Sequence, residues 1–432
     1  MICENITVNG ARLNFAGLDT VELAKKHGTP LYLMDEDRIR NNCRIYLEAI
    51  KKHFGKDSQP LYASKAASFK RIYEIMKEEG MGIDLVSPGE IFTAVQAGFP
   101  MENSFFHGNN KTDSDIALAM EKGVGYFMAD NMCELIAVNA LAKENGITQK
   151  VIIRLTPGID PHTYAAVATG KVDSKFGVAI ETGQADAFVK EAITFENIEI
   201  VGYHCHVGSQ VFDEEGSVYL DASTIMLGFG AEMQKKYGVE MKILNMGGGF
   251  GVRYTEADPY MDIEGNIAKL AAHIKSEAAR LGISMPRILM EPGRSIVADT
   301  GMTLYSVGTV KEITGYKNYV SIDGGMTDNP RYALYGSKYT VLLANRMDEE
   351  KSFTADVAGR CCESGDIIQP DVKMPKPVRG DIIAVCTTGA YNYSMASNYN
   401  RIPRPPVVMI SGGNDYVAIK RETYEDLVRN DI

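Results

Sequence analysis

The sequence predicts an α/β protein in which a TIM-like (β/α)8 barrel is joined to a C-terminal β-rich domain. Between about residues 60 and 295, eight short apolar runs alternate with charged stretches of helical periodicity. Eight such units over roughly 240 residues match the length of a (β/α)8 barrel. After about residue 300 the pattern changes to β-rich runs such as MTLYSVGTVKEI and YVSIDGG, with little helix between them.

The N-terminal residues contain short strand-like runs, NITVNG and PLYLMD, that cannot form a core of their own. We expect them to pair with the β-rich domain, because an isolated strand needs a sheet to pair with. The predicted domains are residues 1–35 as strands that join the β domain, residues 36–296 as the barrel, and residues 297–432 as the β domain. A doubly wound open sheet is the alternative, but no G-x-G-x-x-G turn opens the first helix.

Composition limits the classes of partner. The 432 residues carry a formal net charge of -11 and no lysine-rich or arginine-rich run, which argues against nucleic acid and anionic membranes. No apolar run approaches the roughly 20 residues of a membrane span. The seven cysteines are scattered and the first residues lack a signal-peptide pattern, so we expect a reduced, cytoplasmic protein. A small-molecule substrate fits this composition best.

Polar residues follow the predicted strands, and barrel enzymes carry their active-site residues at strand ends. Lys65 follows the apolar run LYAS, where burial would lower the pKa of its amine and let it bond to an aldehyde as a Schiff base. An isolated lysine is more often a surface residue, so this interpretation depends on the other strand ends. Those ends carry Asp84, His107, Arg154, His206, the glycines 247–249 and Glu291.

The run NMGGGFG at residues 245–251 follows the predicted seventh strand. Glycines remove side chains from a turn, so backbone N–H groups can approach a phosphate there, although three glycines can also mark only a tight turn. The eighth strand ends in EPGR, which brings Glu291 and Arg294 beside this loop. A buried Glu291 needs a cationic partner, such as a pyridinium N–H. An aldehyde-binding lysine, a phosphate turn and this carboxylate together indicate pyridoxal 5'-phosphate.

The run HCHVGSQ at residues 204–210 allows two interpretations. His206 could cover one face of the cofactor ring, and Ser209 could add a hydroxyl to the phosphate site. Alternatively, His204 and His206 alternate along a strand and could bind zinc, as in hydrolases built on barrels. We expect no metal, because no carboxylate-rich strand end is expected nearby and zinc would leave Lys65 unexplained.

Seven motifs in order, YASKAAS, HCHVGSQ, GGGFG, EPGRS, RYALYG, CESGD and GAYNYS, resemble those of the diaminopimelate decarboxylases, which are fold-type III pyridoxal phosphate enzymes. The resemblance implies that Lys65 forms the Schiff base, that His206 stacks on the ring, and that Glu291 pairs with the ring nitrogen. It also implies that two glycines and Arg294 hold the phosphate. The cofactor-binding residues that we predict are Lys65, Asp84, His206, Ser209, Gly248, Gly249, Glu291, Gly293, Arg294 and Tyr391.

The same resemblance implies a reaction, the decarboxylation of meso-2,6-diaminopimelate to L-lysine and carbon dioxide, which is the last step of lysine biosynthesis. Cys362 matches the proton donor of the family, and either Cys362 or Lys65 would reprotonate the product. Two arginines can clamp a distal carboxylate while Glu363 binds the neighbouring ammonium. The predicted substrate-binding residues are Arg294, Arg331, Tyr335, Glu363 and Tyr391. Because the family builds its sites at a two-fold interface, we expect a homodimer with shared active sites.

Three alternatives remain open. A decarboxylase for ornithine, arginine or a carboxylated polyamine must bind a distal cation, and Arg294 and Arg331 do not suit that task. A racemase resembling alanine racemase would place an arginine opposite the ring nitrogen, where this chain has Glu291. A non-catalytic carrier of pyridoxal phosphate would resemble the barrel alone and would not need the residues after Arg294.

Overall fold

The computed structural model describes residues 1–159, 174–212 and 217–432. These residues form two compact units, each assembled from non-consecutive segments. The barrel unit comprises Cys43–Gly251 and Met261–Gly293, and the β unit comprises Met1–Asn42, Val252–Tyr260 and Arg294–Ile432. The domain boundaries predicted after residues 35 and 296 stay a prediction. Within these described ranges, no helix combines the length and apolar character that a membrane crossing requires.

In the barrel unit, eight parallel strands of the described residues close into a cylinder, which confirms the predicted fold class. The chain passes around the barrel in sequence order, and the last strand pairs with the first. The strands are β5 (Gln59–Ala63), β6 (Gly82–Leu85), β7 (Ser104–Phe106), β8 (Tyr126–Ala129), β9 (Gln149–Thr156), β11 (Ile198–His204), β12 (Ile243–Asn245) and β13 (Arg287–Met290), and the short β10 (Val178–Ala179) pairs with β9.

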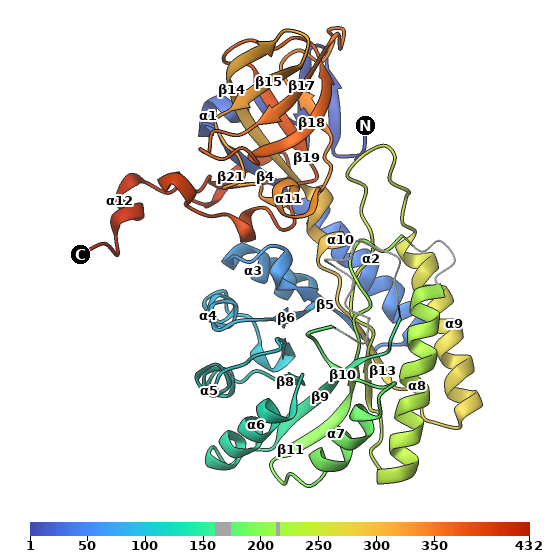
Figure 1. Cartoon of the computed structure of the whole chain (residues 1–432). Coiled ribbons are helices and arrows are strands. Elements are labelled where there is room, and N and C mark those ends of the chain that lie inside the picture. The colour runs from blue at the N-terminus through green and yellow to red at the C-terminus, as the bar shows by residue number, and fades with distance from the viewer. Residues whose placement is uncertain (160–173, 213–216) are drawn as a thin grey trace. The chain divides into compact units, whose positions relative to one another are not determined.

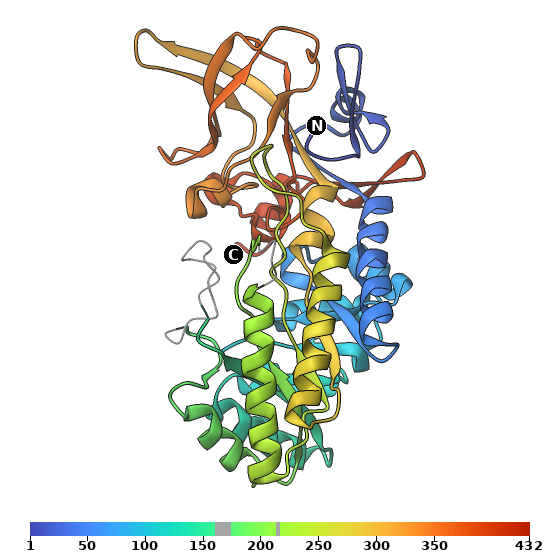
Figure 2. The same ribbon diagram turned by 90° about the vertical axis from the view of Figure 1, so that its right-hand side faces the viewer.

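Helices between these strands lie on the outside of the cylinder (Figure 1). Their ends follow local capping rules: the side chains of Ser87 and Asn131 accept backbone N–H groups at the starts of α4 and α6. Gly80 and Gly282 end α3 and α9 in the left-handed conformation. Figure 2 shows α8 and α9 running side by side. The helices between the strands are α3 (Lys70–Glu79), α4 (Pro88–Gln96), α5 (Asp113–Glu121), α6 (Met132–Glu144), α7 (Gln184–Ala192), α8 (Ser217–Tyr237) and α9 (Ile263–Leu281), with the 3-10 helices η1 (Ser64–Ala66) and η2 (Met101–Asn103). Helix α2 (Glu36–Phe54) precedes β5.

The barrel is filled by apolar side chains, which explains why the strands read as continuous apolar runs. The side chains in this cluster come from seven of the barrel strands. None of them is more than 9% exposed, because parallel strands covered by helices bury both faces. They are Leu61, Phe105, Met128, Ile152, Val201, Ile243 and Leu289.

The β unit is organised around one long strand, β14 (Gly301–Ile313), which pairs with β4, β15 and β19. Strand β4 (Leu31–Asp35) lies between β14 and β20 (Val407–Ser411), antiparallel to the first and parallel to the second. A separate small sheet contains β1 (Ile6–Asn9), β2 (Arg12–Phe15) and β3 (Leu18–Asp19). The other strands are β15 (Lys317–Ile322), β16 (Val341–Leu343), β17 (Phe353–Ala358), β18 (Ile367–Met374), β19 (Ile382–Cys386) and β21 (Asn414–Ile419).

Short helices connect these strands. Helix α10 begins at Arg294, directly after the last residue of the barrel unit. The helical segments are α1 (Thr20–His27), α10 (Arg294–Val297), α11 (Arg331–Tyr335), α12 (Tyr424–Val428), η4 (Ala298–Thr300), η5 (Tyr393–Met395) and η6 (Tyr399–Arg401).

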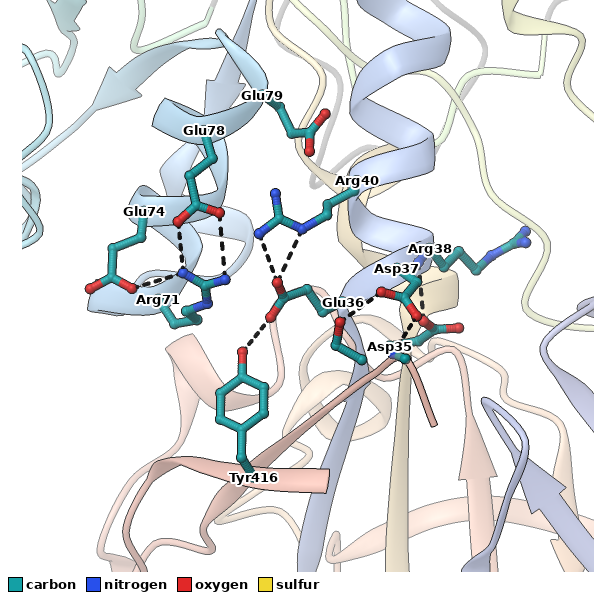
Figure 3. A network of polar contacts seen from close by, with 12 residues as sticks. Asp35, Glu36, Asp37, Arg38, Arg40, Arg71, Glu74, Glu78, Glu79 and Tyr416 are labelled. Atoms are coloured by element: carbon teal, nitrogen blue, oxygen red, sulfur yellow. Dashed lines mark hydrogen bonds and ion pairs between the residues drawn. The ribbon is translucent and has the colours of Figure 1, made fainter. Parts of the chain in front are cut away.

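Polar side chains fix the start of α2 within the β unit (Figure 3). The Glu36 carboxylate accepts hydrogen bonds from Arg40 Nε at 3.0 Å, from Arg40 Nη2 at 2.7 Å and from the Tyr416 hydroxyl. Asp37 accepts hydrogen bonds from the hydroxyl of Ser411 and the N–H of Gly412, both at 2.8 Å. These contacts tie the helix to the β20–β21 hairpin. In the barrel unit, Figure 3 also shows an arginine of α3 paired with two glutamates of the same helix.

Candidate active site

Lys65 lies in η1, directly after β5. Its side chain is exposed, whereas the flanking Ser64 and Ala66 are fully buried. The burial predicted for this amine is therefore wrong: β5 ends at Ala63, and in the 3-10 turn that follows, with three residues per turn, Lys65 points to solvent while its two neighbours point inward. The turn is held by the Tyr62 hydroxyl, which donates to the carbonyl of Ala67 at 2.9 Å. The amine is thus accessible to a ligand at the C-terminal end of a barrel strand.

Glu291 follows β13 and has three polar partners from three other strand ends. Its Oε1 lies 2.9 Å from His107 Nε2 and accepts a hydrogen bond from Asn245 Nδ2 at 2.6 Å. Its Oε2 lies 3.4 Å from His204 Nε2. Burial by itself would raise the pKa of Glu291, but His107 and His204 lower it well below its usual value. Glu291 is therefore a buried carboxylate whose ionised form the two neighbouring histidines favour.

Asp84 belongs to the same cluster. Its Oδ1 lies 3.8 Å from His107 Nε2 and has no hydrogen-bond partner among the described residues. Burial raises the pKa of Asp84, and His107 opposes that rise. The rings of His107 and His204 meet edge to face with centroids 5.0 Å apart. Sequence reasoning missed this role of His204, because the alternation of a strand shows which side chains share a face but not what they meet.

The glycine turn after β12 packs against the backbones of neighbouring strand ends. A Cβ on Gly248 would lie 2.0 Å from the carbonyl oxygen of Glu291, and one on Gly249 would lie 2.2 Å from that of Gly208. Glycine is thus required for this close approach. The N–H of Gly247 donates to Asn245 Oδ1 at 2.9 Å, and the N–H of Gly248 donates to His206 Nδ1 at 3.2 Å.

Asn245 therefore joins the turn to Glu291, since its amide donates to the carboxylate and accepts from the backbone. This residue was not among the predicted site residues. The signal that could have found it is an amide placed directly before a glycine run and at the end of a buried strand, where only a hydrogen-bonded polar side chain is tolerated.

His206 lies just beyond β11, half-buried, beside this turn. Burial and the nearby Lys65 ammonium lower the pKa of His206 well below its usual value. Ser209 is half-buried in the same segment, and Gly293 is buried after β13, where a Cβ would lie 2.9 Å from that of Ala63. Of the predicted cofactor-binding residues in the barrel unit, His206, Gly248 and Glu291 are joined by direct contacts, and Lys65 acts on His206 electrostatically.

In the β unit, the structure brings together four of the predicted substrate-binding residues. The guanidinium of Arg294 lies 4.8 Å from the ring centre of Tyr391, and that of Arg331 lies 5.2 Å from the same ring. Arg331 also lies 5.3 Å from the ring of Tyr335, and its buried Nε makes no hydrogen bond among the described residues. Tyr391 has φ of +61°, which is uncommon for a bulky residue and typical of functional sites. Two buried cations therefore share one aromatic ring.

Cys362 and Glu363 lie in the loop after β17, and both are exposed. The loop is fixed from beneath by Asp366, whose carboxylate accepts the N–H groups of Cys361 at 2.8 Å and Met326 at 2.6 Å. The N–H of Cys362 donates to Asn400 Oδ1 at 2.8 Å. The thiol is therefore carried on an ordered loop.

The structure also corrects one reason given against a metal. The zinc interpretation paired His204 with His206 and found no carboxylate nearby. Instead, His204 meets His107 and Glu291, and one ligand atom from each of the three lies within 4.8 Å of the others. The carboxylate follows another strand, 87 residues after His204 in the sequence, which is why the local pattern did not reveal it.

Comparison with known proteins identifies the family. Residues 37–298 match the model of the pyridoxal-dependent decarboxylase, pyridoxal binding domain. A diaminopimelate decarboxylase of Bacillus subtilis is 44% identical over 420 residues, which are 97% of this chain and 95% of that protein.

Two solved structures extend the comparison. A diaminopimelate decarboxylase of M. jannaschii in co-complex with L-lysine has a TM-score of 0.90 and 34% identity, covering 99% of this chain and 98% of that chain. A lysine/ornithine decarboxylase of Vibrio vulnificus complexed with putrescine has a TM-score of 0.75 and 25% identity, covering 90% and 97%. The chain therefore belongs to the family of pyridoxal-dependent decarboxylases that includes these diaminopimelate decarboxylases.

Proposed function

We propose that the protein is a carboxy-lyase that uses pyridoxal 5'-phosphate to convert meso-2,6-diaminopimelate to L-lysine and carbon dioxide, the last step of lysine biosynthesis. The observation that carries this proposal is the similarity to named diaminopimelate decarboxylases over almost the whole chain, including the β unit. The paired arginines beside Tyr391 support it independently, because they suit a substrate whose far end carries a carboxylate.

The residues of the barrel unit fit the cofactor. When bound, pyridoxal phosphate accepts the electron pair that is released as carbon dioxide leaves. The accessible amine of Lys65 suits its aldehyde, and the ionised, buried Glu291 suits a protonated ring nitrogen. His206, kept neutral by burial and by Lys65, suits contact with the ring face. The remaining assignments in the barrel unit are Asp84, Ser209, Gly248, Gly249 and Gly293, and those in the β unit are Arg294 and Tyr391.

The β unit supplies substrate selection in this proposal. Arg331 and Arg294 bind the distal carboxylate, and Glu363 binds the distal ammonium. With the far end held, the scissile carboxylate can be oriented away from these cations, so that binding energy lowers the barrier to its loss. Tyr335 and Tyr391 position the arginines through ring contacts. The division into residues 1–35, 36–296 and 297–432 belongs to this proposal as well.

Proton delivery to the product is assigned to Cys362 Sγ or Lys65 Nζ. Both residues are exposed in the single chain, which supports an active site that is completed by a second copy of the chain. We therefore propose a homodimer in which Lys65 of one chain and Cys362 of the other serve one site. The seven cysteines are all free, which supports a reducing compartment and hence the cytoplasm.

A substrate panel tests the proposal. The purified protein with pyridoxal phosphate is supplied separately with meso-diaminopimelate, ornithine, arginine and lysine, and released carbon dioxide and amine products are quantified. We expect turnover of meso-diaminopimelate with L-lysine as the product, and catalytic efficiency at least about 100-fold lower for the other three. A preference for ornithine or lysine would replace the proposed substrate, and bound cofactor without any release of carbon dioxide would indicate a carrier.

A further inference from the structure

We propose that the cofactor-free protein binds one Zn²⁺ ion through His107, His204 and Glu291, and that this ion and pyridoxal phosphate exclude each other. His204 ends β11, and His107 and Glu291 directly follow β7 and β13, so all three lie at the rim where the parallel barrel strands end. Residues far apart in the sequence thus converge on one point.

The spacing of the ligand atoms suits zinc. Two ligands at Zn–N and Zn–O distances of about 2.0–2.1 Å in tetrahedral geometry lie roughly 3.4 Å apart. His204 Nε2 lies 3.4 Å from Glu291 Oε2, and His107 Nε2 lies 2.9 Å from Glu291 Oε1. All of the ligand atoms lie within 4.8 Å of one another. The 3.4 Å distance suits an ion held by His204 Nε2 and Glu291 Oε2, whereas the 2.9 Å distance runs to the other carboxylate oxygen, so His107 joins the set within the 4.8 Å spread of the ligand atoms.

The chemistry of the donors points to the same ion. Two imidazoles and one carboxylate form a zinc set that leaves the fourth position open. The side chains are only 6%, 1% and 7% exposed, and among the described residues His204 Nε2 makes no hydrogen bond that the ion would have to break. The hydrogen bond from Asn245 to Glu291 Oε1 would orient the carboxylate from outside the ligand shell. The carboxyl group of Asp84 lies 3.8 Å from His107, directly beside this set.

Exclusion follows from the use of one carboxylate by two cations. This step rests on the proposed function, in which Glu291 pairs with the protonated ring nitrogen of the cofactor. A Zn²⁺ ion on Glu291 would repel that N–H and occupy the space beside it. Zinc should therefore inhibit cofactor loading, and protein that already holds the cofactor should not bind zinc at this site.

The first experiment titrates the full-length protein with ZnSO₄ against a chromophoric zinc indicator, before and after loading with pyridoxal phosphate. We expect one tightly bound ion per chain without cofactor and loss of that site after loading. Absence of a stoichiometric site in the cofactor-free protein overturns the proposal. Equal zinc binding before and after loading overturns the mutual exclusion. If the protein binds zinc but does not load the cofactor at all, the proposed function fails while the zinc site stands.

Variants locate the site. His204→Gln and His107→Gln each remove one ligand from a different strand, and zinc affinity should fall by more than the roughly 10–100-fold typical of outer-shell changes. His53→Gln is the matched control, because His53 lies on α2 in the barrel unit and outside the cluster, and its zinc affinity should not change. Circular dichroism melting identifies any variant that fails to fold. If one of the two ligand variants does not fold, the zinc affinity of the other one tests the proposal. Unchanged affinity in a folded His204→Gln or His107→Gln protein assigns the zinc elsewhere, for example to exposed cysteines, and overturns the proposal.

Discussion

Replacing Lys111 with methionine should strongly destabilise the barrel unit, because Lys111 is half of a buried ion pair. Its Nζ donates to the carbonyls of Gly108 at 2.9 Å and Met128 at 2.7 Å, and to Glu134 Oε1 at 2.9 Å. The two charged side chains are 1% and 2% exposed. Burial lowers the pKa of Lys111 and raises that of Glu134, while each charge opposes the shift of the other. All three ammonium hydrogens are therefore satisfied inside the protein.

Lys111→Met leaves the Glu134 charge buried without its partner and leaves two carbonyls unbonded. Breaking such a pair costs about 3–5 kcal/mol, which corresponds to a fall in melting temperature of roughly 6–20 °C for a domain of this size. The double variant Lys111→Met/Glu134→Leu should recover much of this loss, because neither charge then remains buried alone. Because Gly108 follows His107 directly, cofactor affinity should fall as well.

Circular dichroism melting measures these changes. The matched control is Lys242→Met, which removes an ion pair with Glu199 at 2.7 Å whose side chains are 54% and 41% exposed. An exposed pair contributes no more than about 1 kcal/mol. If Lys111→Met melts within the range of Lys242→Met, or if the double variant is less stable than the single one, then the buried pair does not hold this part of the barrel.

Four further predictions concern pH, specificity, cofactor attachment and assembly. Burial raises the pKa of Asp328 to about 7, so the folded state holds this proton more tightly than the unfolded state. The contribution of Asp328 to the free energy of unfolding is greatest below about pH 4 and falls by about 4 kcal/mol as the pH rises to about 7. The melting temperature of the wild type should therefore fall over this pH range more than that of Asp328→Asn. Profiles of melting temperature against pH that run parallel for the two proteins contradict this prediction. Arg331→Ala should lose about 2–5 kcal/mol of transition-state binding for meso-diaminopimelate, measured as kcat/KM, and unchanged efficiency refutes its role. Lys65→Ala should abolish turnover and the borohydride-reducible attachment of cofactor, and attachment to another lysine contradicts the assignment. Mixed Lys65→Ala and Cys362→Ala chains should recover about a quarter of wild-type activity, because half of the dimers keep one intact site; confirmed mixed dimers without recovery exclude a shared site.

The barrel was predictable because its strands are buried on both faces and its helices on one, so apolar runs and amphipathic stretches mark them directly in the sequence. The rule that parallel strands end at one rim then placed Lys65, His206 and Glu291 in one region. The exposure of Lys65 was not predictable, since it depends on where β5 ends and on the turn that follows.

By itself, the sequence determined the order of the elements, the kind of chemistry at the strand ends and the family to which the chain belongs. Only the tertiary structure decided that His107 and His204 meet on Glu291, that Arg294 and Arg331 share the ring of Tyr391, and that β4 lies between β14 and β20. Periodicity reports which face of an element is buried and not which distant residue it meets. Those contacts join segments far apart in the chain, and they are set by strand pairing and side-chain packing of the whole unit.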